Sequence, residues 1–116
     1  MNRFKDLNVW QKAMDLTTEI YRITEKFPQA EKFGLISQIN RSVVSIPSNI
    51  AEGAGRNSKK EFSHFLSIAI GSAFELETQL LIAQNLKYIS GDKPKELVTE
   101  LSNIQNMLFG LKKSLN

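Results

Sequence analysis

Apolar side chains recur at three- and four-residue intervals along four separate stretches of this 116-residue chain. Such spacing places them on one face of an α-helix, because the helix repeats every 3.6 residues. No segment shows the sustained alternation of apolar and polar residues that marks a half-buried strand. Only three prolines and six glycines interrupt the chain. The sequence therefore predicts an all-α fold of four long helices joined by short connections.

The expected helices have recognisable start and stop signals. We expect them over residues 9–26, 30–51, 58–89 and 94–115. Asn8 is a candidate N-cap of the first helix, and Pro28 follows its end. The run Ser58-Lys59-Lys60-Glu61 fits the S-x-x-E capping box and starts the third helix. The glycines of Gly53-Ala54-Gly55 end the second.

Pro47 lies inside the second apolar pattern, which begins at Phe33 and continues to Ile50. A proline in a helix removes one backbone donor and costs about 3 kcal/mol if nothing compensates. Because the pattern continues past it, we expect one bent helix and not two separate ones. The hydroxyl of Ser45 or Ser48 is the candidate partner for the freed carbonyl.

The length suits one domain, so we assign residues 1–116 to a single four-helix bundle. Short links favour an antiparallel up-down-up-down arrangement. The third helix is apolar nearly all round, and a helix of that kind must be covered on more than one side. One bundle cannot easily provide that cover. The sequence therefore predicts a homo-oligomer.

Few residues in the chain are suited to catalysis or cofactor binding. The absence of cysteine excludes a thiolate nucleophile and a cysteine zinc site. Glu61-Phe-Ser-His64 matches the Glu-x-x-His motif of di-iron bundles, but such a site needs two copies of the motif, and His64 is the single histidine. No phosphate-binding glycine loop or nucleophile elbow is present. We expect no enzymatic activity, no metal and no cofactor.

The beginning of the chain carries charges throughout and lacks the apolar stretch of a secretory signal. The longest uncharged stretch contains polar residues, and we expect no membrane-spanning segment. Together with the missing cysteines, these features indicate a protein of the reducing cytoplasm.

Charge placement is more informative than the net charge of +3. In an up-down bundle, the ends of the second and fourth helices lie beside the starts of the first and third. That end collects three carboxylates and seven cationic side chains: Arg3, Lys5, Arg56, Lys59, Lys60, Lys112 and Lys113. We call these seven residues the basic end. Phosphate binding requires such a cluster, although terminal lysines can equally serve solubility alone.

The second helix carries a polar stripe opposite its apolar seam, formed by Gln38, Arg41, Ser45, Asn49 and Glu52. The stripe is a solvated face or, because its groups are mostly compact and hydrogen-bonding, a subunit interface. Glu75 falls in an apolar stripe of the third helix, where a buried carboxylate would need a partner. Arg41 is the candidate partner. We therefore list Gln38, Arg41, Asn49, Glu52 and Glu75 as structural or interfacial residues.

Three motifs resemble one known family. Phe4-x-x-Leu7-x-Val9-Trp10-Gln11-Lys12-Ala13 opens the chain, and Ser45-Ile46-Pro47-Ser48-Asn49-Ile50-Ala51-Glu52-Gly53 follows Leu35-x-x-Gln38-Ile39-x-Arg41-Ser42. The third motif is Phe62-x-x-Phe65-Leu66-x-Ile68-Ala69-x-Gly71-Ser72, followed by Glu75-Leu76-Glu77-Thr78. Together they resemble the four-helix-bundle proteins encoded by intervening sequences in bacterial 23S rRNA genes.

The resemblance implies an up-down bundle, cyclic oligomers such as pentamers, no catalysis and no cofactor. A related branch comprises accessory proteins of diversity-generating retroelements, which are basic pentamers that bind nucleic acid and a reverse transcriptase. The leading hypothesis is therefore a non-enzymatic homo-oligomer that binds RNA or another nucleic acid through its basic end. The alternative is a protein-binding scaffold with no nucleic-acid role.

Overall fold

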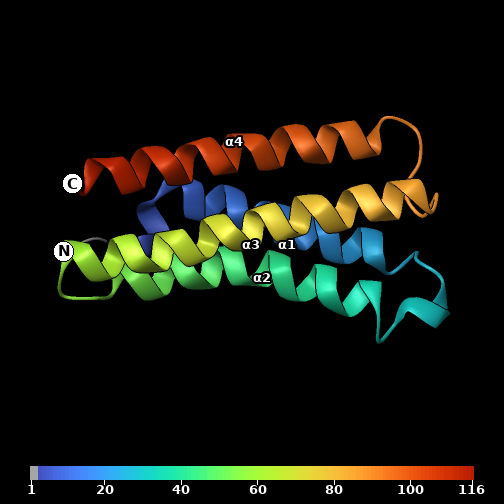
Figure 1. Ribbon diagram of the computed structural model, residues 1–116, viewed down its shortest axis with the longest axis horizontal. Coiled ribbons are helices and arrows are strands. Elements are labelled where there is room, and N and C mark those ends of the chain that lie inside the picture. The colour runs from blue at the N-terminus through green and yellow to red at the C-terminus, as the bar shows by residue number, and fades with distance from the viewer. Residues whose placement is uncertain (1–2) are drawn as a thin grey trace.

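Four long helices make up most of residues 3–116, the part of the chain that the computed structural model describes. They are α1 (Asn8–Thr24), α2 (Leu35–Ala54), α3 (Lys59–Asn85) and α4 (Lys93–Ser114), with short 3₁₀ helices η1 (Phe4–Asp6) and η2 (Gln29–Glu31). No strand occurs within this part, so the all-α prediction of four helices is confirmed. In Figure 1 the chain runs four times along a molecule of 43 × 25 × 20 Å and turns back at each connection.

Several predicted helix ends differ from the structure, among them the start of α1 and the end of α3. Asn8 is not an N-cap, because α1 already includes it and Leu7 precedes the helix without a side-chain cap. α3 ends at Asn85 and not at residue 89, because Lys87 adopts a left-handed φ of 64°. The amide of Tyr88 then donates to the Ala83 carbonyl at 2.9 Å, which is the Schellman pattern of a helix C-terminus.

The predicted capping residue Ser58 is confirmed as the N-cap of α3. Its side-chain oxygen accepts a hydrogen bond from the Glu61 amide at 3.1 Å. This bond satisfies one of the donors that every helix start leaves free. It fixes where the α2–α3 connection ends, and so where Lys59 and Lys60 begin the helix.

The second helix starts later than predicted. α2 begins at Leu35, because Gly34 has φ −108° and ψ −110°, which are not helical angles. The preceding residues form η2 instead. Phe33 is therefore outside the helix and 90% exposed, so its predicted place in the apolar seam is wrong.

α2 is a single helix through Pro47, as predicted, and Pro47 is buried within it. The partner of the freed carbonyl was predicted wrongly. The Val43 carbonyl accepts from Thr17 Oγ1 at 3.3 Å, so α1 supplies the hydroxyl and not Ser45 or Ser48. The same Thr17 oxygen also donates to the Ala13 carbonyl at 2.7 Å. α1 thereby stabilises α2 at the position that proline weakens.

α3 is the central helix and packs against both α2 and α4. Its buried side chains are Phe62, Leu66, Ala69, Ile70, Ser72, Ala73, Leu76, Leu80 and Ala83. By length and composition alone, α3 could cross a membrane, and the central helix of a bundle meets the same criteria. Several of its apolar side chains remain exposed, among them Ile68, Phe74, Leu81 and Ile82.

Candidate nucleic-acid interface

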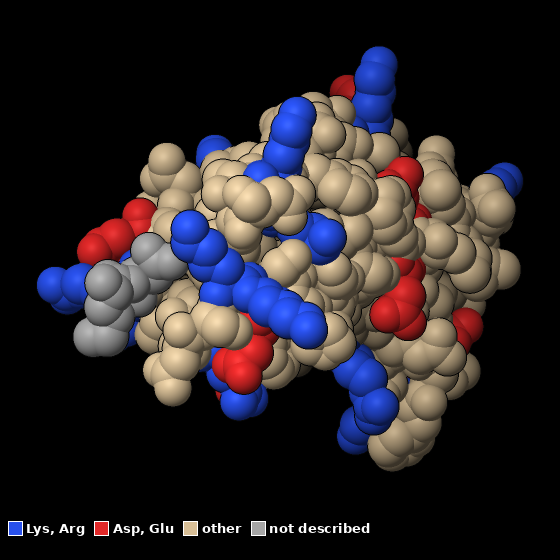
Figure 2. Space-filling model, turned by 60° about the vertical axis from the view of Figure 1, so that its left-hand side comes forward, with Lys and Arg blue, Asp and Glu red and all other residues tan. Residues whose placement is uncertain are grey.

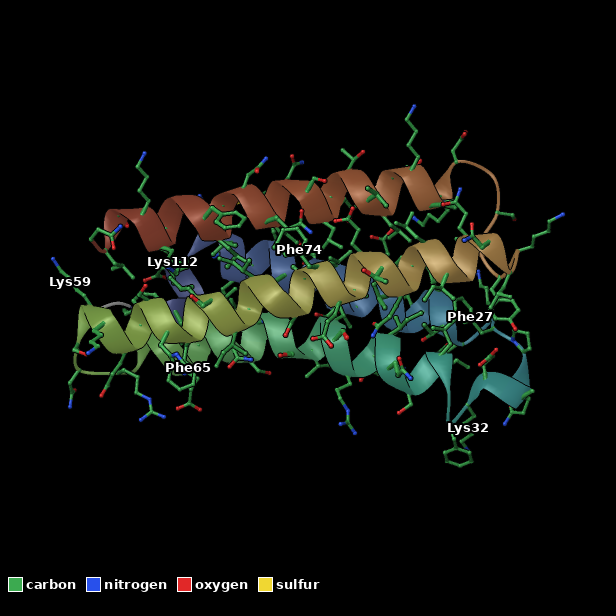
Figure 3. All side chains as sticks on the ribbon, viewed as in Figure 1. Phe27, Lys32, Lys59, Phe65, Phe74 and Lys112 are labelled. Atoms are coloured by element: carbon green, nitrogen blue, oxygen red, sulfur yellow. The ribbon has the colours of Figure 1, made fainter. Side chains whose placement is uncertain are left out.

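One end of the bundle brings together residues that are far apart in the sequence. A groove of about 270 Å³ is lined by Arg56 and Lys59 from the α2–α3 connection and by Leu115 from the end of the chain. Figure 3 shows Lys59 of α3 and Lys112 of α4 at this same end. The expected convergence of the α2–α3 connection with the last turn of α4 is therefore present.

The first described residues lie at the same end. Phe4 packs edge-on against Trp10 with ring centroids 5.2 Å apart, and both line a groove with Ala51 near the end of α2. Gln11 Nε2 donates to the Lys5 carbonyl at 2.7 Å, which holds η1 against the start of α1. Arg3 and Lys5 thus join the other cations of the basic end.

Most cations of the basic end have no carboxylate partner. Within residues 3–116, ion pairs involve only two of the seven: Arg56 with Glu52 at 2.9 Å and Arg3 with Asp6 at 3.7 Å. The remaining five are Lys5, Lys59, Lys60, Lys112 and Lys113. Lys112 is half-buried and the other four are exposed. Figure 2 shows Lys and Arg side chains spread over this end, with few Asp and Glu side chains between them.

A second, wider pocket beside this groove adds aromatic groups to the cations. It has a volume of about 560 Å³ and is lined by Arg56, Ser58, Lys60, Glu61, His64 and Phe65. The Arg56 guanidinium lies 4.9 Å from the Phe65 ring centroid, and the His64 ring meets Phe65 edge-on at 5.5 Å. Cations beside aromatic rings are the groups on which unpaired bases stack.

His64 and Phe65 were not predicted as part of this site. His64 follows Lys60 by four residues and Phe65 follows Glu61 by four, so helical spacing places each beside a residue of the first turn. This spacing was the sequence feature from which the two residues could have been assigned to the site. The position of the Arg56 side chain over Phe65 depends on how the connection folds, which no local pattern shows.

The predicted interfacial residues on α2 and α3 do not form one cluster. Asn49 Nδ2 donates to the Ser45 carbonyl at 2.8 Å, and Ser45 Oγ meets Ser72 Oγ at 2.8 Å across the two helices. Glu52 is engaged by Arg56. Of these contacts, the Ser45–Ser72 hydrogen bond joins α2 to α3, and the Glu52–Arg56 pair joins the end of α2 to the basic end.

Gln38, Arg41 and Glu75 lie exposed on the surface. The predicted Arg41–Glu75 pair is absent among the ion pairs of the described chain. Because Glu75 lies on the solvent side of α3, its carboxylate stays hydrated and needs no partner.

A separate polar cluster links α1 to the start of α4. Lys93 Nζ donates to Glu19 Oε2, and this bond raises the pKa of Lys93. Partial desolvation would raise the pKa of Glu19, but hydrogen bonds with Lys93 and Glu100 outweigh it and the pKa is lowered. Partial desolvation and the nearby Glu19 raise the pKa of Glu100. The cluster joins two helices that otherwise make few contacts.

The side chains gathered at this end are mainly cations and aromatic rings. Within residues 3–116 no three side chains of His, Asp or Glu converge on a position that could hold a metal ion. What the described part does contain is a cationic, partly aromatic surface at one end.

Comparison with known proteins agrees with the fold. Among curated proteins none matches this chain. A solved structure from Bacteroides thetaiotaomicron, described as a protein of unknown function from the S23 ribosomal protein family, superimposes with a TM-score of 0.84. It shares 26% identity, and the match covers 90% of this chain and 95% of that one. The family model of the 23S rRNA-intervening sequence protein matches residues 5–110. The chain therefore belongs to the 23S rRNA-intervening sequence protein family.

Proposed function

We propose that this protein is a non-enzymatic, antiparallel up-down-up-down bundle that assembles into a cyclic homo-oligomer, a pentamer, and binds RNA in the cytoplasm through its basic end. The observation that carries the proposal is the convergence of three chain segments on that end. Five of its seven cations make no ion pair within residues 3–116.

Free cations at one end favour a polyanion for a simple reason. A phosphate backbone releases condensed counterions when lysine or arginine replaces them, and the affinity grows with the number of phosphates neutralised. In a cyclic assembly, every subunit presents the same surface to the same side. Several basic ends would then act on one strand at once, which raises the effective affinity without new contacts.

The pocket beside Phe65 favours unpaired over double-stranded RNA. Arg56 and Lys60 supply charge there, and the rings of His64 and Phe65 supply a surface for a base. Bases are free to leave the stack only in single-stranded regions, and stacking on an aromatic side chain contributes about 1–3 kcal/mol per base.

The proposal is tested with a fluorescently labelled, mixed-sequence oligoribonucleotide, whose binding is followed by anisotropy at low salt. The variant carrying Arg56→Ala, Lys59→Ala and Lys60→Ala should bind about tenfold more weakly or worse. The matched control removes three cations from the opposite end: Lys26→Ala, Lys32→Ala and Lys87→Ala. It lowers the net charge equally and should bind nearly as well as the unmodified protein.

Two results would contradict the proposal. Equal losses in both variants would mean that only net charge matters, and not the basic end. No detectable affinity of the unmodified protein at low salt would remove the RNA-binding function and leave the protein-binding scaffold as the reading to pursue.

A further inference from the structure

A shallow apolar groove runs between α1 and α2. It has a volume of about 400 Å³ and eight lining residues, none of them charged: Phe4, Trp10, Met14, Thr17, Val44, Pro47, Ser48 and Ala51. Met14 is 41% exposed and Val44 is 38% exposed. We call this surface the α1–α2 groove.

An aromatic ridge lies along the seam of the other two helices. Phe74 of α3 and Phe109 of α4 have ring centroids 6.4 Å apart, and both are nearly half exposed. Figure 3 shows Phe74 between these helices, midway along the molecule. We call these two residues, together with the exposed Leu81, the α3–α4 ridge.

Away from the basic end, the surface around the ridge is also poor in charge. At helical spacing, its uncharged neighbours on the two helices are Ser63, Ser67, Ile70, Thr78, Asn85, Val98, Ser102 and Gln105, whereas Lys112 and Lys113 follow Phe109 by three and four residues toward the basic end. Glu77 is the acidic group near this seam, and it is half-buried and accepts a hydrogen bond from Gln105 Nε2 at 2.9 Å.

Other charges of the middle of the bundle lie on the side formed by α1 and α4. Lys12, Asp15 and Glu100 line the groove between α1 and α4, and Glu19 and Lys93 pair nearby. Depletion of charge combined with exposed aromatic and methionine side chains is the composition of an interface core, and not of an ordinary solvated face.

The two uncharged surfaces complement each other. One is a hollow and the other a pair of projecting rings, and they share no helix. They also lie at similar heights, because Val44 is near the middle of α2 and Phe74 near the middle of α3. A contact between two different surfaces of one chain is head-to-tail, and it closes into a ring when the rotation permits.

Two glycines beside the ridge also support a contact with a second copy. A Cβ added at Gly71 or Gly110 would meet nothing within 4 Å in this chain. A glycine within a helix lowers the stability by about 1 kcal/mol relative to alanine. Packing within this chain does not explain why Gly71 and Gly110 are glycine and not alanine. The close approach of a second backbone would give that reason.

We infer that the α3–α4 ridge of one copy inserts into the α1–α2 groove of the next copy. The inference rests on the homo-oligomer of the proposed function and names the surfaces that form it. The exposed polar residues Gln38, Arg41 and Glu75 then lie outside the contact.

The test uses two variants, each of which damages one surface and leaves the other intact. Val44→Glu places a charge in the groove, and Phe74→Glu places one on the ridge. Light scattering after gel filtration should show that each variant alone is a monomer while the unmodified protein is an oligomer. Mixed in equal amounts, they should form a heterodimer of twice the monomer mass, because the intact ridge of the first fits the intact groove of the second.

Ile82→Glu is the matched control, because Ile82 is 43% exposed on α3 and the helical repeat turns it by about 80–100° from Phe74 and Leu81, onto a different side of the helix. It should assemble like the unmodified protein. If a variant does not fold by circular dichroism, Met14→Glu replaces the groove change and Phe109→Glu the ridge change.

The possible outcomes separate this inference from the proposed function. An unmodified protein that is monomeric overturns both the inference and the proposed oligomer. Oligomers that survive Val44→Glu or Phe74→Glu, or that are lost in Ile82→Glu, overturn the inference alone. Single variants that do not pair when mixed also exclude the head-to-tail contact.

Discussion

A substitution at Gly53 would test how closely α2 packs on α3 beside the basic end. It is buried near the end of α2, and a Cβ added there would lie 2.8 Å from Phe65 Cβ, 2.9 Å from Phe62 Cδ1 and 3.2 Å from the Phe62 carbonyl oxygen. The Phe65 Cβ is fixed to the backbone, so no rotamer change relieves that contact. We predict that Gly53→Ala destabilises the protein, although alanine is the better helix former.

The magnitude follows from two opposing effects. Replacing a helical glycine by alanine contributes about 1 kcal/mol in favour of folding. Overpacking a well-packed site costs about 1–3 kcal/mol, and two contacts below 3.0 Å place Gly53 near the upper limit. The expected net loss is about 1–2 kcal/mol. For a chain of this size, that loss lowers the Tm by about 3–10 °C.

Gly71→Ala is the control, because nothing lies within 4 Å of a Cβ at that position. In the Val44→Glu background, where we expect a monomer, it should raise the Tm by about 3–5 °C. Thermal unfolding by circular dichroism at one protein concentration measures both changes in that background. A Gly53→Ala protein as stable as its parent would refute the close packing of α2 on Phe62 and Phe65.

Three further predictions concern single hydrogen bonds and charges. Thr17→Val should lower the free energy of unfolding by about 1 kcal/mol in urea titration, because it leaves the Val43 carbonyl without its hydroxyl partner. The control Thr18→Val changes an exposed residue and should have little effect. Equal effects of the two variants would refute the role of Thr17. Ser58→Ala should cost about 1 kcal/mol by the same measurement, since it removes the N-cap of α3, and an unchanged midpoint would contradict that role. Glu100→Gln should raise the Tm near pH 7, with a smaller gain near pH 4. The pKa of Glu100 is higher in the folded than in the unfolded protein, so the stability that its protonated form contributes is lost as the pH rises through the folded pKa. A gain independent of pH would contradict this sign.

The fold was predictable in outline because burial repeats along the helices. The four apolar seams, the Ser58 cap and the continuity of α2 through Pro47 all follow from local patterns. The errors occurred where tertiary contacts or backbone angles decide. Phe33 has the spacing of a core residue but precedes the helix start at Leu35, and the partner of the Val43 carbonyl comes from another helix.

The candidate site was predictable in its charges but not in its shape. Chain reversal at each connection was enough to expect Arg56 and Lys112 at one end. The pocket formed by Arg56, His64 and Phe65 depends on side-chain directions in the connection. The prediction of an Arg41–Glu75 ion pair was wrong, because helical periodicity places Glu75 on an apolar stripe but does not show that this stripe is exposed.

The most direct test of the central claim is the salt dependence of RNA binding. Each phosphate contact contributes about 0.7 to the slope of log K against log salt concentration for a single strand. Removing the charges of Arg56, Lys59 and Lys60 should therefore reduce the slope by about 2. The variant that lacks Lys26, Lys32 and Lys87 should keep the slope of the unmodified protein. If the slope stays the same without the charges of Arg56, Lys59 and Lys60, these residues do not contact phosphate, and the account of the basic end is wrong.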